Sequence, residues 1–173
     1  TLVLSCEYQS SMEVEVPFLL GEFRVNQEYA LVPDDNNLRT GDWTLQGYPF
    51  YAGSLFYEFA LDTELPQDKR YFLEVNDFVA TTVMVTVNDT AINIPWKSEG
   101  FFEITSLLQG KNTIAVEVSS SPRNLLGPFH LAEGHPKNTQ ASSFTPTGNQ
   151  AISGYQLHPY GLYSPPKLYT AAK

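Results

Sequence analysis

The chain has 173 residues, 42% of them hydrophobic, and a net charge of −9 from 10 Lys and Arg against 19 Asp and Glu. At roughly 100–200 residues per domain, this length predicts one domain spanning residues 1–173. The acidic balance argues against nucleic acid as a partner, because phosphates bind to basic surfaces. No apolar run approaches the ~20 residues that cross a bilayer, so we expect no membrane span.

The first residue is Thr1 and no export signal follows it, so we interpret the chain as a fragment or a processed product. The one cysteine, Cys6, excludes an internal disulfide and a cysteine-based zinc site. Cys6 alternates with apolar residues in a strand-like pattern. We therefore expect a buried, inert thiol, since a cysteine without a disulfide behaves as a small hydrophobic residue.

Apolar and polar residues alternate with a period of two along most of the chain, which predicts strands with one buried face. The alternating segments are residues 2–8, 12–16, 55–61, 82–87 and 113–118. Residues 71–75 predict a further strand that is apolar on both faces except at Glu74, and residues 90–94 and 102–104 predict shorter ones. Asn88 and Asp89 separate two of them and predict a tight hairpin. Only residues 105–108 indicate a helix, of one turn at most. This pattern predicts an antiparallel β-sandwich or barrel.

Residues 119–173 differ from the rest, because they are rich in Gly and Pro and show little periodicity. They also carry many large apolar side chains, too many for a free linker. We expect long irregular loops that wrap over the sandwich, with residues 152–157 and 167–170 returning as strands.

Two polar clusters are candidate metal sites. His130, Glu133 and His135 lie in a loop rich in Gly and Pro, where the rigid ligand spacing of a metal site is missing, so we favour a surface or loop-packing role. The second cluster offers oxygen ligands for calcium without the EF-hand pattern, and a solvated turn is the favoured interpretation. Its residues are Asp34, Asp35, Asn36 and Asp42. We expect no cofactor, with a structural calcium ion as the alternative.

Acidic residues are numerous enough for a glycosidase, which needs two carboxylates that face each other across a cleft. Most of them occupy outward strand positions, where a solvated face is the default. Those positions are Glu7, Glu13, Glu15, Glu58 and Glu117. We therefore predict no catalytic residue in this chain and keep a small glycosidase as an alternative.

Aromatic residues in loops are the more informative feature. Trp43, Tyr48, Phe50 and Tyr51 lie close together in one loop, and Trp96 follows Pro95. Exposed rings flanked by polar groups stack on the apolar faces of sugars. The alternative is that the rings close the ends of the sandwich as part of its core.

Two segments resemble a known family: Val83-Met-Val-Thr-Val-Asn-Asp, and Phe102 to Val118 with the sequence FEITSLLQGKNTIAVEV. They are similar to the sugar-binding-type jelly-roll domain of glycoside hydrolase family 2, although Asp89 replaces the family's hairpin glycine and Glu103 replaces an aspartate. Residues 47–53, 123–130 and 161–166 resemble the accessory β-sandwich of large bacterial glycosidases, including the α-L-rhamnosidase-like ones. The resemblance is best over residues 41–130.

The resemblance implies an all-β, jelly-roll sandwich of galactose-binding-domain topology. It also implies a non-catalytic carbohydrate-binding module of a larger, extracytoplasmic glycoside hydrolase, whose catalytic acids lie in a separate barrel domain. The expected partners are carbohydrate and that catalytic domain. The alternative is a purely structural domain that packs against the barrel.

A sugar site is expected where the loops of one end of the sandwich converge. The candidate loops are residues 43–51, 95–99 and 123–130, which offer rings and a planar guanidinium for sugar hydroxyls. We predict Trp96 as the main platform, because a large ring after Pro95 is hard to bury wholly. The full set is Trp96, Tyr48, Tyr51, Trp43, Arg123 and His130.

Overall fold

The computed structural model describes residues 3, 5–7, 9–10, 18–61, 65–94, 100–134 and 136–173. Its elements are short and mostly strands. In chain order they are β1 (Phe23–Val25), β2 (Leu31–Pro33), η1 (Trp43–Gln46), β3 (Ser54–Leu61), β4 (Lys69–Glu74), β5 (Phe78–Val79), β6 (Thr82–Val87), β7 (Thr90–Asn93), β8 (Phe101–Glu103), η2 (Thr105–Leu107), β9 (Asn112–Ser119), α1 (Arg123–Leu126), α2 (Ala141–Phe144), η3 (Gly148–Gln150), β10 (Gly161–Leu162) and β11 (Lys167–Ala172).

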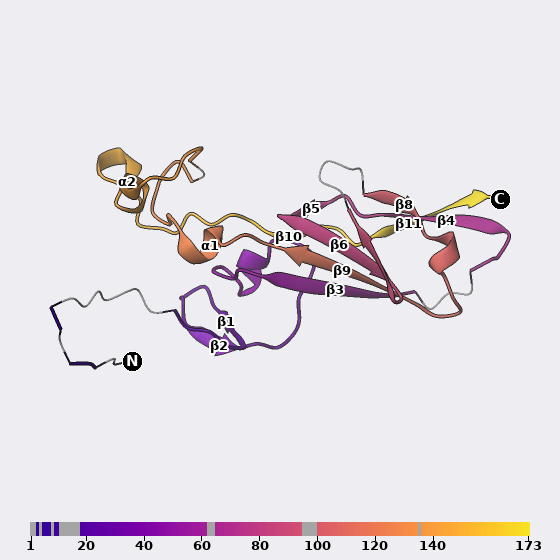
Figure 1. Cartoon of the computed structure of the whole chain (residues 1–173), viewed down its shortest axis with the longest axis horizontal. Coiled ribbons are helices and arrows are strands. Elements are labelled where there is room, and N and C mark those ends of the chain that lie inside the picture. The colour runs from indigo at the N-terminus through magenta and orange to yellow at the C-terminus, as the bar shows by residue number, and fades with distance from the viewer. Residues whose placement is uncertain are drawn as a thin grey trace.

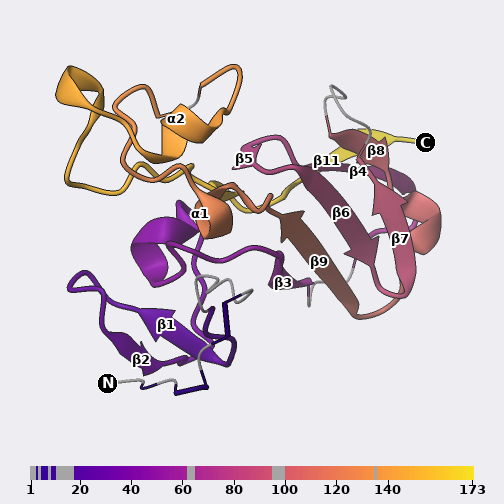
Figure 2. The same cartoon turned by 60° about the vertical axis from the view of Figure 1, so that its left-hand side comes forward.

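Two antiparallel sheets form the body of the molecule. Within the described residues, the larger sheet has the order β3-β9-β6-β7 and the smaller sheet has the order β11-β4-β8. Figure 1 shows both sheets in one half of an elongated molecule, with the C-terminus beside the smaller sheet. Figure 2 shows the β1–β2 hairpin, α1 and α2 in the other half. The chain is therefore an all-β sandwich, as predicted.

The core lies between the inner faces of the two sheets, and rows of paired side chains build it. In the larger sheet Tyr57, Val116, Val85 and Ile92 are successive neighbours across four strands. In the smaller sheet Leu168, Leu73 and Phe102 form the corresponding row. Val85, Val116 and Leu73 are fully buried. All seven side chains belong to, or pack against, a single hydrophobic cluster, so the two sheets share one core.

The strand predictions for the middle of the chain are confirmed. Residues 55–61, 71–75, 82–87, 90–94, 102–104 and 113–118 correspond to β3, β4, β6, β7, β8 and β9, with ends shifted by no more than a few residues, and residues 105–108 contain η2. Period-two alternation succeeds there because each strand buries one face against the common core. No helix in the described part of the chain is long and apolar enough to cross a membrane.

The N-terminal predictions have a different outcome. Residues 12–16 lie outside the described residues, as do residues 2, 4 and 8. At the described positions 3, 5–7, 9 and 10 there is no strand, and the expectation of a buried Cys6 is wrong because Cys6 is exposed. Val3 is also exposed, at 79%. Alternation buries a face only where another layer covers it, and no layer covers these described positions.

The last third follows the prediction only in part. Residues 167–170 lie within β11, which pairs with β4 along its whole length. Residues 152–157 do not form the predicted strand. Isolated backbone bonds hold that segment instead, from Ile152 N–H to the His130 carbonyl (2.9 Å) and from Gln156 N–H to the Phe129 carbonyl (2.7 Å). The segment that carries α1 and α2 extends away from the sheets rather than over them (Figures 1 and 2).

The β6–β7 hairpin turns at Asn88 and Asp89, as predicted, with Val87 paired to Thr90. Asn88 adopts a left-handed conformation with φ of 52°. Its side-chain amide donates to the Leu107 carbonyl (2.8 Å) and to Asn112 Oδ1 (3.1 Å), and its Oδ1 accepts from Thr113 N–H (3.0 Å). The turn residue therefore also ties the hairpin to η2 and β9.

Substitutions at Asn88 separate these two roles. Asn88→Gly keeps the left-handed backbone but loses the side-chain bonds, and we expect a loss of about 1–3 kcal/mol in the free energy of unfolding. Asn88→Ala loses the same bonds but keeps a Cβ in this conformation, so we expect it to be about 1–2 kcal/mol less stable than Asn88→Gly. Urea denaturation of both variants measures the difference. Equal stabilities would show that the backbone conformation carries no cost here.

Candidate functional site

The predicted loop of residues 43–51 packs onto the end of the sandwich, and its rings are buried to different degrees. Trp43 is fully buried, and its ring lies edge-on to Tyr51 (6.0 Å between centroids) and against Tyr160 (5.7 Å). Tyr48 is buried at 8% exposure, and Tyr51 is half-buried with its hydroxyl bonded to the Ser54 carbonyl. The Trp43 ring therefore has no surface to offer a ligand, and Tyr48 has little.

The predicted loop of residues 123–130 lies beside the first one. Arg123 Nη2 donates to the carbonyls of Gly134 (2.7 Å) and Gln156 (3.2 Å), so it braces the returning chain. Burial lowers the pKa of the Arg123 guanidinium. His130 is exposed, and its Nδ1 lies 3.0 Å from the Gly154 carbonyl oxygen. Trp96 and the loop of residues 95–99 lie outside the described residues, as does His135.

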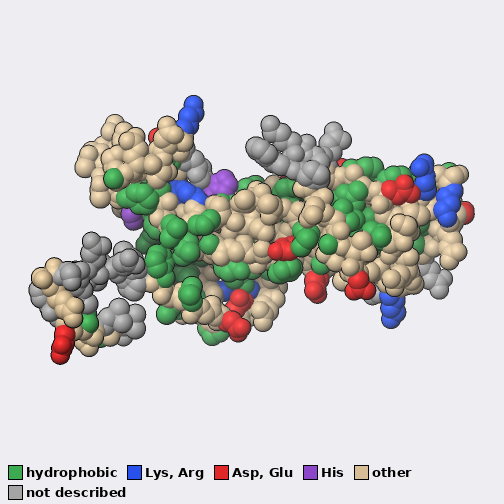
Figure 3. Space-filling model, viewed as in Figure 1, with side chains coloured by type: hydrophobic (Ala, Val, Ile, Leu, Met, Phe, Trp, Pro, Cys, Tyr) green, Lys and Arg blue, Asp and Glu red, His purple; other side chains and the backbone are tan. Residues whose placement is uncertain are grey.

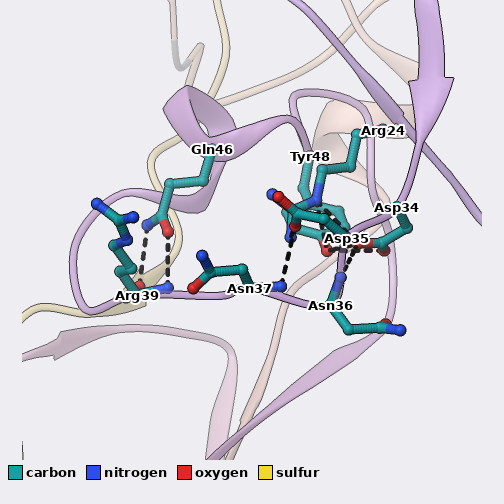
Figure 4. Close-up of polar contacts among 8 residues, drawn as sticks. All are labelled: Arg24, Asp34, Asp35, Asn36, Asn37, Arg39, Gln46 and Tyr48. Atoms are coloured by element: carbon teal, nitrogen blue, oxygen red, sulfur yellow. Dashed lines mark hydrogen bonds and ion pairs between the residues drawn. The ribbon is translucent and has the colours of Figure 1, made fainter.

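A polar network holds the β1–β2 hairpin against this end (Figure 4). Arg24 Nε donates to Asp34 Oδ1 (2.9 Å) and to the Tyr48 hydroxyl (3.1 Å), and that hydroxyl donates to Asp34 Oδ2 (2.8 Å). Arg24 Nη2 also lies 2.5 Å from Asp35 Oδ1. The side chains of Arg24 and Asp34 are only 12% and 19% exposed, whereas that of Asp35 is 66% exposed.

The network shifts the pKa values of its members. Burial alone raises the pKa of the Asp34 carboxyl, but the Asn36 N–H, the Tyr48 hydroxyl and the Arg24 guanidinium outweigh burial, so the pKa lies below its ordinary value. Burial and the Asp34 carboxylate raise the pKa of Tyr48. Asp34 is therefore ionised at neutral pH and is a structural anchor in this structure.

The turn of η1 fits closely against the same hairpin. Asp42 Oδ1 accepts from Thr44 N–H (2.9 Å) and from the Thr44 hydroxyl (2.7 Å), which caps η1. Gly47 ends η1 with φ of 96°, and its carbonyl accepts from Val25 N–H (2.8 Å). A Cβ at Gly47 would lie 2.8 Å from Arg24 Cβ and Cδ, so only glycine allows this approach.

Tyr155 is the centre of an aromatic cluster at this end of the molecule. Its ring centroid lies 4.9 Å from that of Tyr29, 5.0 Å from Phe50, 5.6 Å from Phe129 and 5.1 Å from His130. Phe50 and Phe129 also meet edge-on at 5.8 Å. Tyr155 and Tyr29 remain 41% and 53% exposed. The structure thus brings two of the three predicted loops together around an exposed ring pair.

Tyr29 has a strained backbone, with φ of 58°. Residues 26–30 hold it there, because Asn26 Oδ1 accepts from the N–H groups of Glu28 (3.0 Å) and Ala30 (2.9 Å), while Tyr29 N–H donates to the Asn26 carbonyl (2.9 Å). A bulky residue rarely adopts positive φ, and such strain gathers at functional sites. Here the strained residue is also the one that meets Tyr155.

Two adjacent hollows share the Tyr29 and Tyr155 rings. One, of about 730 Å³, is termed here the polar cleft, and its polar lining residues are Arg24, Asn26, Gln27, Thr44, Gln46 and Gln156. The other, of about 530 Å³, is termed the apolar groove and includes Phe18, Leu19, Leu20, Phe50 and Phe129. Figure 3 shows hydrophobic side chains gathered over this end of the body. The described residues that line the two hollows include no Asp or Glu.

The candidate calcium ligands make other contacts in this structure, and the His130, Glu133 and His135 cluster is not described in full because His135 lies outside the described residues. Asp34 and Asp35 face Arg24, and Asp42 caps η1. Among the described residues, no group of three His, Cys, Asp or Glu side chains has an arrangement that could hold a metal ion. Of the outward acids that are described, Glu7 and Glu58 are exposed.

The sequence pattern does not single out four members of the site, which are Tyr29, Phe129, Tyr155 and Gln156. Tyr155 follows Gly154 in an irregular segment, so it offers the same signal as Trp96 after Pro95, an aromatic residue where the chain bends. The positive φ of Tyr29 has no local sequence signal, because neither glycine nor an asparagine occupies that position. Long-range contacts between residues 29, 50 and 155 bring the site together.

Comparisons with known proteins find fold neighbours among solved structures only. No family model matches the chain, and no curated protein matches it. The rhamnosidase from Novosphingobium sp. PP1Y matches at 19% identity and a TM-score of 0.45, over 70% of this chain and 11% of that one. The FMN-binding β-glucuronidase from Facaelibacterium prausnitzii L2-6 matches at 19% identity and a TM-score of 0.40, over 84% of this chain and 20% of that one.

The β-D-glucuronidase from Dictyoglomus thermophilum matches at 22% identity and a TM-score of 0.41, over 88% of this chain and 27% of that one. The chain thus spans little more than a quarter of these glycoside hydrolases at most. Identities and TM-scores this low show no activity for this chain.

The Arg24–Asp34–Tyr48 network predicts a pH-dependent stability. Asp34→Asn is expected to lower the free energy of unfolding at neutral pH by about 1–3 kcal/mol, because Arg24 and Tyr48 lose a charged partner. The matched Asp35→Asn, at an exposed carboxylate, is expected to cost no more than about 1 kcal/mol. Urea denaturation of both variants measures this difference.

The sign of the pH effect follows from the lowered pKa of Asp34. Its contribution is complete above the ordinary carboxyl pKa of 3.8 and is lost as the pH falls through the lower pKa of the folded state. The difference in the free energy of unfolding between the unaltered chain and Asp34→Asn should therefore narrow as the pH falls below the ordinary carboxyl pKa of 3.8. A gap that stays constant down to about pH 2 would contradict the ionised anchor.

Proposed function

We propose that the chain is a non-catalytic carbohydrate-binding module of a larger glycoside hydrolase, and that it binds sugar in the polar cleft. The exposed Tyr29–Tyr155 pair is the observation that carries the proposal. The centroids of the two rings lie 4.9 Å apart, and the lining of the cleft also includes amide side chains. Rings bind the C–H faces of a sugar and amides bind its hydroxyls.

The charges around the polar cleft favour a neutral sugar. Arg24 is the one cation among the described lining residues, and Asp34 and Asp35 already engage it. An anionic ligand would find no uncommitted positive charge there, and a cationic one would find no lining carboxylate. The resemblance to family 2 sugar-binding domains supports the same ligand class.

The apolar groove favours a second role, the docking of the parent enzyme's catalytic domain. Phe18, Leu19 and Leu20 line it and are 56%, 58% and 86% exposed. Exposed apolar patches of this kind mark protein interfaces. If the groove alone were functional, the chain would be a purely structural domain, and it would bind no glycan in isolation.

The resemblance also leads us to propose that the parent enzyme acts outside the cytoplasm. A complete gene whose first codons encode no export signal would overturn that proposal. The alternative of a small glycosidase is tested by incubating the chain with a broad panel of aryl glycosides. Release of the aryl group would overturn the non-catalytic assignment.

A glycan array followed by calorimetry on the 173-residue chain tests the proposed function. Tyr155→Ala is expected to weaken binding of an array-identified soluble oligosaccharide about tenfold or more, because it removes one stacking ring. The matched control is Phe144→Ala, an exposed ring (54%) that lines neither hollow. No glycan binding by the unaltered chain, or equal binding by both variants, would contradict the proposal.

Tyr29→Gly separates the function of the ring from the stability of the fold. Glycine removes backbone strain of about 1–3 kcal/mol while the ring contacts are lost, so we expect the free energy of unfolding to change by less than about 1 kcal/mol. Sugar binding should fall with the ring. Thermal unfolding and calorimetry on the same sample measure both. A large loss of stability would show that Tyr29 serves mainly to hold the hairpin in place.

A further inference from the structure

The polar cleft and the apolar groove share one wall, although their linings differ in chemistry. Five described residues belong to both linings: Val25, Tyr29, Gly47, Pro49 and Tyr155. The ring centroids of Tyr29 and Tyr155 lie 4.9 Å apart, and the two residues are 53% and 41% exposed. The two hollows therefore meet at an exposed ring pair, where a single small ligand can contact both of them.

The apolar groove offers almost no polar partner to a ligand. Among its described lining residues there is no Asp, Glu, Lys or Arg. The Tyr48 hydroxyl donates to Asp34 (2.8 Å), so it is already engaged. The Tyr51 hydroxyl is engaged as well, because it donates to the Ser54 carbonyl (3.0 Å). A charged or strongly polar group would lose its hydration in this groove without gaining hydrogen bonds, so the lining favours an uncharged, apolar group.

Aromatic rings that meet edge-on build part of the groove. The Tyr155 ring lies at 70° to those of Phe50 and Phe129, with centroids 5.0 Å and 5.6 Å away. Phe50 and Phe129 meet each other at 79° and 5.8 Å. The volume of about 530 Å³ falls in the range of roughly 300–1,000 Å³ that small-molecule sites occupy. A flat aromatic group or a short alkyl chain therefore suits this hollow in size and in chemistry.

Docking of a catalytic domain accounts for the exposed apolar side chains of the groove, but it gives no role to the contact between the groove and the polar cleft. A ligand with one polar half and one apolar half accounts for both features. The polar half would meet the amide side chains of the cleft, and the apolar half would meet the rings of the groove. A sugar joined to an apolar aglycone is a molecule of this kind.

We propose that the chain binds glycosides whose sugar lies in the polar cleft and whose uncharged, apolar aglycone lies in the apolar groove. The glycosidic bond then crosses the Tyr29–Tyr155 pair, which both halves of the ligand contact. The inference rests on the proposed function, because it requires a sugar in the polar cleft, and it adds the chemical class of the aglycone. The aglycone contributes affinity by burying its apolar surface, and the sugar sets the orientation through hydrogen bonds.

Calorimetry on the 173-residue chain tests the inference with methyl and phenyl β-D-glycosides of glucose, galactose and xylose. All six compounds are neutral, and the two members of each pair differ only in the aglycone. For a sugar that binds, the phenyl glycoside is expected to bind about tenfold more tightly than the methyl glycoside, because the groove removes the phenyl ring from water.

Phe18→Ala removes a ring that lines the apolar groove and not the polar cleft. It should lower the affinity for the phenyl glycoside toward that for the methyl glycoside, which should itself stay unchanged. The matched control is Phe144→Ala, because Phe144 is 54% exposed against 56% for Phe18 and lines neither hollow. Both side chains are exposed, so both variants should keep the unaltered melting temperature, which circular dichroism verifies. Tyr155→Ala should weaken the binding of both glycosides.

Equal affinities for the methyl and phenyl glycosides, or a difference that survives Phe18→Ala, would overturn the inference and leave the proposed function intact. It is also overturned if no glycoside of the panel binds, whereas the glycan array decides separately whether the chain binds sugar at all. Burial of Phe18 by another domain of the parent enzyme would show that the groove is a protein interface, and it would overturn the inference too.

Discussion

Burial of the Trp43 side chain joins the candidate site to the sandwich. The backbone N–H of Trp43 donates to the Tyr160 carbonyl (2.9 Å), and Gly41 N–H donates to the Leu162 carbonyl (2.7 Å), so an early loop and the returning chain are fixed to each other. The Tyr57 hydroxyl accepts from Leu162 N–H (3.3 Å), which ties both to β3 of the larger sheet. A Cβ at Gly161 would lie 2.1 Å from the Gly41 carbonyl oxygen, so this approach requires glycine. The rings around Tyr155 have fixed positions because the segments on both sides of them are anchored here.

The sequence predicted the strands whose alternate side chains are buried in the core. It failed for segments that bury no face against a second layer. Strands β3, β6 and β9 bury every second side chain in a common core, so their alternation was informative. The β1–β2 hairpin was missed because its strands have three residues each and one of them carries Arg24, which serves the polar network rather than a buried face. The segment of residues 152–157 was wrongly predicted as a strand. Its Tyr155 ring meets the loop rings of Phe50 and Phe129 instead of a sheet.

The candidate site could be predicted by location but not by residue. The loops of residues 43–51 and 123–130 do converge, as the sandwich architecture implies, yet Trp43 and Tyr48 belong to the core and the exposed rings are those of Tyr29 and Tyr155. A loop tryptophan and a loop tyrosine look alike in sequence whether they cover the core or face solvent. Which ring is buried depends on contacts such as Trp43 with Tyr160, more than a hundred residues apart, and no local pattern encodes these contacts.

Charge is used for structure at this end of the molecule, and rings and amide side chains line much of the polar cleft. Arg24 is committed to Asp34 and Asp35, and Arg123 to two backbone carbonyls, so neither guanidinium projects as an uncommitted cation. The smaller sheet differs, because the charges of Glu74 and Lys167 lie on its outer face, where Glu74 also accepts from the Tyr169 hydroxyl. Ion pairs such as those of Arg24 stabilise an irregular loop, because its backbone makes few of the regular hydrogen bonds that join the strands of a sheet. A sheet needs no such anchor, because the backbone hydrogen bonds between β11, β4 and β8 hold its strands in register.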